Sequence, residues 1–154
     1  MADDLYEADF FAWTRAQSDA LRSRKAGRNQ LDYDRLAEEV DDLGAAQKNK
    51  ASSLVRLIIV HLLKLEFSRS DQPRGHWRGE IGNFRADLAP LVSGSIRRLL
   101  EDELEDLHQR ATRIARDQFR DYEPATIIPD DRRWSLPEIL GEHDDPLNVE
   151  AHLH

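Results

Sequence analysis

The segment 32–67 constrains the fold of this chain more than any other stretch, because it contains neither a proline nor a turn dipeptide. Asp32 is a typical N-cap residue, and Leu36, Val40 and Leu43 follow it as a narrow apolar stripe. The segment therefore predicts one long helix, bent or continuous, that reaches Phe67. Such a helix would be about 50 Å long.

The second half of this segment, LVRLIIVHLLKLEF (54–67), is the most apolar part of the chain. It is apolar nearly all round, which is typical of the central helix of a bundle. Arg56 and His61 interrupt it, and its apolar run is about half the length needed to cross a bilayer. We therefore expect a buried helix and no membrane partner.

Three further segments show helical periodicity, and they cover approximately residues 5–24, 77–91 and 96–118. Gly27 is expected to end the first of them, and the loop 68–75 carries a proline and a glycine. After Tyr122 the periodicity is lost, which predicts an irregular arm. Ser135 and Glu138 have the spacing of a capping box, which predicts a short helix at the end of that arm.

The predicted fold is all-α: a four-helix bundle with two long helices and an irregular C-terminal arm that ends in a short helix. Residues 1–141 are expected to form a single helical-bundle domain, and residues 142–154 a polar, flexible tail. An elongated bundle of this kind is compatible with a monomer and with a dimer, and the sequence leaves both open.

Composition excludes several classes of function. Thirty acidic residues against 22 basic ones give a formal charge of −8, and there is no cysteine. The acidity repels nucleic acids, so no nucleic-acid partner is expected. The lack of cysteine excludes disulfides, thiolate metal sites and thiol catalysis. MADDLYEADFFAW at the N-terminus lacks the pattern of a secretory signal, so we expect a cytoplasmic protein.

His61 lies in the middle of the apolar stretch, on one helical face with Leu54, Leu57 and Leu65. An inward imidazole loses solvation when it is protonated. It is therefore either a working group in a dry pocket or a core side chain with a hydrogen-bond partner, and the pattern favours the core side chain. Lys64 lies at the flank of this face, where its ammonium group is expected to reach water.

Glu38 and Glu39 are candidate partners for His61. Two carboxylates can perform acid–base chemistry when their environments separate their pKa values. A straight helix would separate Glu39 from His61 by about 33 Å, so the two meet only if the chain turns back near Gly44 or across a dimer interface. Adjacent glutamates in DRLAEEVDD are more typical of a solvated face.

Trp77 lies among basic residues in RGHWRG (74–79), where a loop meets a helix. An exposed tryptophan there would stack on a base or another planar ligand. The unbroken spacing from Trp77 to Ile81 and Phe84 instead favours a position in the core.

The histidines of the chain body lack metal-ligand spacing, and we find no phosphate loop and no nucleophile elbow. We therefore expect no bound metal and no cofactor.

Four stretches together resemble a known family: YEADFFAW (6–13), LDYDRLAEEVDDLG (31–44), HLLK (61–64) and HW (76–77). They are similar to the bacterial domain-of-unknown-function family 29, an uncharacterised family frequent in cyanobacteria and proteobacteria. The resemblance covers residues 5 to about 141 and implies an all-helical fold without implying an activity. The chain departs from the family pattern in two places. It has HW where SW is common, and RRWSLPE (132–138) where a CPY-like stretch is common.

Glu38, Glu39, His61, Lys64 and Trp77 fall within these motifs and form the candidate functional cluster. We expect a non-catalytic helical-bundle protein that acts through a protein partner or a second copy of itself. The alternative is a small hydrolase or ligand-binding protein that uses a Glu39/His61/Lys64 pocket.

Overall fold

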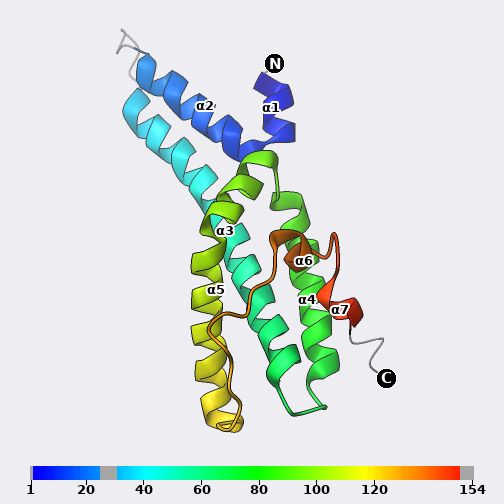
Figure 1. The fold of residues 1–154 in the computed structure, drawn as a ribbon. Coiled ribbons are helices and arrows are strands. Elements are labelled where there is room, and N and C mark those ends of the chain that lie inside the picture. The colour runs from blue at the N-terminus through cyan, green and yellow to red at the C-terminus, as the bar shows by residue number, and fades with distance from the viewer. Residues whose placement is uncertain (1, 25–30, 150–154) are drawn as a thin grey trace. The chain divides into compact units, whose positions relative to one another are not determined.

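The computed structural model describes residues 2–24 and 31–149. Its elements are α1 (Ala2–Ala8), α2 (Phe10–Ser23), α3 (Tyr33–Phe67), α4 (Arg74–Leu88), the 3₁₀ turn η1 (Ala89–Leu91), α5 (Gly94–Tyr122), α6 (Leu136–Leu140) and α7 (Pro146–Val149) (Figure 1). These described residues contain no strand, so the all-α prediction is confirmed. As predicted, α3 is one helix, and it is 35 residues long.

The chain forms two compact units. Unit 1 comprises Met1–Ala51 and Leu91–Leu99, and unit 2 comprises Ser52–Pro90 and Leu100–His154. The helices α3 and α5 each begin in unit 1 and end in unit 2. The single domain expected over residues 1–141 stays a prediction.

In unit 1, α2 lies beside the first half of α3 (Figure 1). Gly44 of α3 faces Thr14 of α2, both residues are buried, and the Phe11 ring lies beside them. At the far end of α2, the Arg22 guanidinium binds the Asp41 carboxylate at 2.6 Å. Small residues at the contact allow the two backbones to approach closely.

The first predicted helix is divided in two at Asp9. The backbone of Asp9 is not helical, and its carboxylate accepts a hydrogen bond from the Ala12 N–H at 3.0 Å, so Asp9 caps α2. The Ser95 N–H donates to the same carboxylate at 2.8 Å. Burial raises the pKa of Asp9, but the hydrogen bonds from the Ser95 hydroxyl, from these two N–H groups and from the Ser93 hydroxyl outweigh it and lower the pKa. The predicted helix stop at Gly27 lies outside the described residues.

In unit 2, the second half of α3 packs with α4 and the greater part of α5 around an apolar core. Its fully buried side chains include Ile59, Leu63, Ile81, Leu100 and Phe119. None of the helices described is long and apolar enough to cross a membrane.

The arm after α5 runs back beside that helix and leads to α6 (Figure 1). The predicted capping box is present, with Ser135 and Glu138 each bonded to the other's backbone N–H. Beyond α6, Arg78 donates to the Leu147 carbonyl at 3.1 Å. Asp145 also has a partner, because it binds Arg85. The flexible tail expected over residues 142–154 stays a prediction.

Replacing Gly44 with alanine is expected to destabilise the protein by about 2 kcal/mol, despite the higher helix propensity of alanine. The added Cβ would lie 3.2 Å from the Thr14 Cβ and closer still to its hydroxyl. Gly79→Ala in α4 is the matched control: its Cβ meets nothing within 4 Å, so it should stabilise by about 0.5 to 1 kcal/mol. Urea unfolding measures both changes, and a stabilising Gly44→Ala would contradict the close approach.

Candidate functional site

The predicted cluster is divided between the two units. His61 and Lys64 on α3 and Trp77 on α4 belong to unit 2, whereas Glu38 and Glu39 are exposed residues of unit 1. The site in unit 2 is formed by the helix pair α3 and α4, which the loop 68–73 connects.

His61 is buried and uses both ring nitrogens. Its Nδ1 lies 2.8 Å from the Leu57 carbonyl, and because a carbonyl only accepts, Nδ1 carries a hydrogen. Its Nε2 is in close contact with the Glu80 carboxylate. The Phe84 ring packs edge-on against the imidazole, with the ring centroids 5.2 Å apart. The favoured interpretation of His61 as a core side chain with a hydrogen-bond partner therefore fits its contacts.

Glu80 joins this buried histidine to an exposed one. Its second carboxylate oxygen lies 3.2 Å from Nε2 of His76, whose side chain is 72% exposed. The hydrogen bond with His61 lowers the pKa of Glu80. Sequence reasoning missed Glu80, although a signal existed: it lies three residues after Trp77 and four before Phe84, on the inward flank of α4.

Lys64 and Trp77 come together as the sequence analysis grouped them. The Lys64 ammonium group lies over the Trp77 ring, 5.6 Å from its centroid. Burial lowers the pKa of Lys64, while the negative charge of Glu80 opposes that shift. Trp77 is only 6% exposed, which agrees with the core position that its spacing favours and leaves no face for stacking a base.

The geometry of this site limits its chemistry. A general base needs a nitrogen lone pair directed at a substrate, and both nitrogens of His61 are engaged by Leu57 and Glu80. The sequence analysis offered Glu39 as the partner of His61, whereas the carboxylate that contacts it is Glu80. Over residues 2–24 and 31–149 we find no group of three or more side chains able to hold a metal ion. The contacts instead hold α3 to α4.

The comparisons with known proteins agree with this fold. A family model described as "Domain of unknown function DUF29" matches residues 5–143. The chain belongs to this family. The DUF29 assignment confirms the resemblance drawn from the sequence motifs, and it brings no activity with it. None of the curated proteins matches the chain.

A solved structure has a similar fold. The crystal structure of an α-helical protein of unknown function from Rhodospirillum rubrum is similar to this chain over 96% of each chain, with 25% identity and a TM-score of 0.79. This likeness supports the helical fold and carries no functional assignment.

Proposed function

We propose that this DUF29 chain is a non-catalytic helical protein that acts by pairing with a second copy of itself through α3. The observation that carries the proposal is a row of exposed residues in unit 1, spaced alternately by three and four: Leu36, Glu39, Leu43, Ala46 and Lys50. This is the spacing of a coiled-coil seam. The engaged nitrogens of His61 support the non-catalytic part of the proposal.

Three of the five residues in the row are apolar: Leu36, Leu43 and Ala46. Leu36 is 40% exposed and Leu43 is 56% exposed. Among the described residues, five of the seven exposed large apolar side chains belong to unit 1: Leu5, Tyr6, Leu31, Leu36 and Leu43. Exposed apolar surface concentrated in this way is typical of an interaction surface.

The charges at the two ends of the row complement each other in an antiparallel pair. A two-fold axis between Gly44 and Ala45 lies five and a half residues from both Glu39 and Lys50. It therefore places Glu39 of one copy opposite Lys50 of the other. The same axis places Leu43 opposite Ala46, a large residue against a small one. This self-complementarity favours a second copy over an unrelated partner.

Sedimentation equilibrium from about 1 to about 300 μM protein tests the proposal. The wild-type chain should change from monomer to dimer over this range. The Leu36→Ser, Leu43→Ser double variant should weaken the dimer at least about thirtyfold, because burial of each leucine stabilises by about 1 to 2 kcal/mol. Ile127→Ser is the control, since Ile127 is 83% exposed but lies in unit 2. A wild-type monomer throughout the range would refute the proposal.

A further inference from the structure

The last turns of α5 and the arm that follows enclose a pocket in unit 2. Its volume is about 420 Å³, which is within the range of small-molecule sites. Besides Gln109, Thr112 and two aspartates, four arginines line it: Arg113, Arg116, Arg120 and Arg133. Such a concentration of arginine is notable in a chain whose formal charge is −8.

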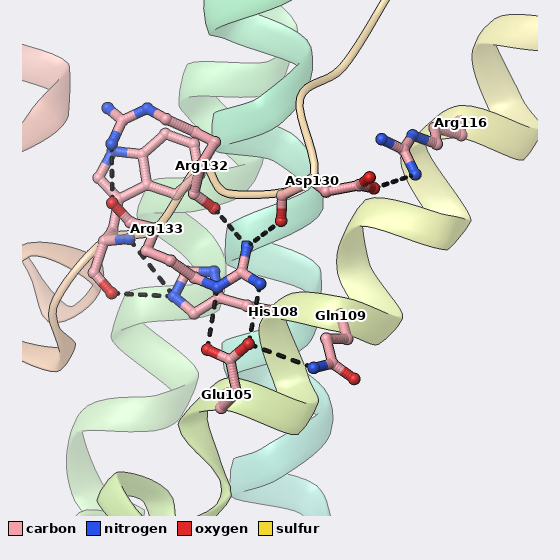
Figure 2. Close-up of polar contacts among 8 residues, drawn as sticks. Glu105, His108, Gln109, Arg116, Asp130, Arg132 and Arg133 are labelled. Carbon is pink, nitrogen blue, oxygen red and sulfur yellow. Dashed lines mark hydrogen bonds and ion pairs between the residues drawn. The ribbon is translucent and has the colours of Figure 1, made fainter.

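Arg133 is fully occupied and closes one side of the pocket. Figure 2 shows its guanidinium over the Glu105 carboxylate, with hydrogen bonds of 3.0 and 2.9 Å. The bond with Arg133, followed by one from Gln109, lowers the pKa of Glu105 to about 2. Arg133 also donates to the Asp130 carbonyl at 2.7 Å. It therefore shapes the pocket and is not available to a ligand.

Two of the other arginines have weak partners, and one has none. Arg116 pairs with Asp130 at 2.6 Å (Figure 2) and also donates to the Ile128 carbonyl, while Arg120 pairs with Asp117 at 2.8 Å. The two carboxylates are 87% and 58% exposed. Solvent weakens such surface pairs, so an anion can compete for both arginines. Arg113 has no hydrogen-bond or ion-pair partner in the part of the chain that the structure describes.

Thr112 is the buried polar group of this pocket. Its side chain is 5% exposed, and its hydroxyl has no hydrogen-bond partner among the described residues. A helical threonine ordinarily bonds the carbonyl four residues earlier, which Thr112 does not do. A buried hydroxyl without a hydrogen-bond partner destabilises a protein, and such groups are uncommon in native structures. A ligand in the pocket would supply the partner.

We propose that this pocket binds the phosphate group of a small phosphorylated metabolite. Arg113 and the Thr112 hydroxyl donate to the phosphate oxygens, and Arg116 and Arg120 contribute positive potential. The fork of N–H groups on a guanidinium matches phosphate oxygens in geometry and charge. The volume leaves room for an organic group beside the phosphate, so a phosphate monoester should bind more tightly than inorganic phosphate.

Calorimetric titration with inorganic phosphate and with phenyl phosphate tests this at low salt. Arg113→Gln should weaken binding of phenyl phosphate by about tenfold or more, the effect of one charged hydrogen bond. Arg110→Gln is the control, because Arg110 is exposed on the same helix, pairs with Asp106 and lies outside the lining. It removes the same charge and should change the affinity less than about twofold.

Thr112→Val separates binding from folding. It should weaken phenyl phosphate binding by about five- to tenfold and raise the Tm of the unliganded protein, since it removes an unpaired buried hydroxyl. If inorganic phosphate binds as tightly as phenyl phosphate, free phosphate is the ligand, and the proposal of a phosphorylated metabolite is wrong. If neither compound binds, or if Arg113→Gln and Arg110→Gln weaken phenyl phosphate binding equally, the proposed site is wrong.

Discussion

Replacing Trp134 with alanine is expected to lower the free energy of unfolding by about 4 kcal/mol, the usual cost of removing a buried aromatic side chain. Trp134 lies in the arm and is 4% exposed. Its ring stacks on His108 with centroids 6.3 Å apart, and the Arg132 guanidinium lies 4.2 Å from the ring centroid on the indole face. Trp134 is therefore an anchor of the arm, together with Ile128, which is 2% exposed.

The backbone of Trp134 also contacts His108. Its carbonyl lies 2.9 Å from Nε2 of His108 and its N–H lies 3.4 Å from the same nitrogen, so the shorter contact favours a hydrogen on Nε2. Burial lowers the pKa of His108, which favours the neutral ring, although the carbonyl opposes that shift.

Urea unfolding followed by circular dichroism measures the effect of Trp134→Ala. Trp134→Phe should lose clearly less, because it retains a stacking ring. Ile127→Ala changes a side chain of the same arm that is 83% exposed, and it should stay within about 0.5 kcal/mol of the wild-type chain. A Trp134→Ala variant as stable as Ile127→Ala would show that the arm is not anchored in this way.

Replacing Arg85 with methionine is expected to cost about 3 kcal/mol, because it leaves a partly buried carboxylate without its partner. Arg85 is bidentate to Asp145 at 3.0 and 2.9 Å, and it donates to the carbonyls of Ile139 and Glu138. The two side chains are only 15% and 19% exposed. Arg85→Lys keeps the charge but not the fork, so it should recover only part of the loss.

This loss should depend on pH. Burial raises the pKa of Asp145, but the hydrogen bonds from Arg85 outweigh it, and the folded pKa lies below the ordinary 3.8. The pair therefore stabilises fully above about pH 4, and its contribution disappears as pH falls through the folded pKa. The difference between wild type and Arg85→Met should be largest at pH 7 and shrink below pH 4. If wild type and Arg85→Met differ in stability by the same amount at pH 7 and below pH 4, the ion pair is contradicted.

The sequence predicts the helices well because each depends on a local pattern. Periodicity located all four long segments, and the spacing of Ser135 and Glu138 located α6. The break at Asp9 was missed because an N-cap inside an apolar stripe interrupts no periodicity. Arg85 and Asp145 are 60 positions apart in the sequence, so no local pattern predicts that they pair.

The candidate site was only partly predictable for the same reason. The apolar face of α3 marked His61, but the choice of Glu80 as its partner depends on the register between α3 and α4. The sequence does show that the last turns of α5 are basic, and such charges suit the C-terminal end of a helix dipole. These arginines line a pocket only because of the path that the arm takes. The arm has no sequence periodicity from which that path could be predicted.

Charge reversal at Glu39 and Lys50 tests the proposed self-association most directly. Sedimentation equilibrium of Glu39→Lys and Lys50→Glu should each show a dimer at least about tenfold weaker than wild type, because each puts like charges opposite one another across the two-fold axis. The double variant Glu39→Lys, Lys50→Glu restores opposite charges and should recover most of the wild-type affinity. Single variants that dimerise like wild type, or a double variant weaker than both singles, would contradict pairing through α3.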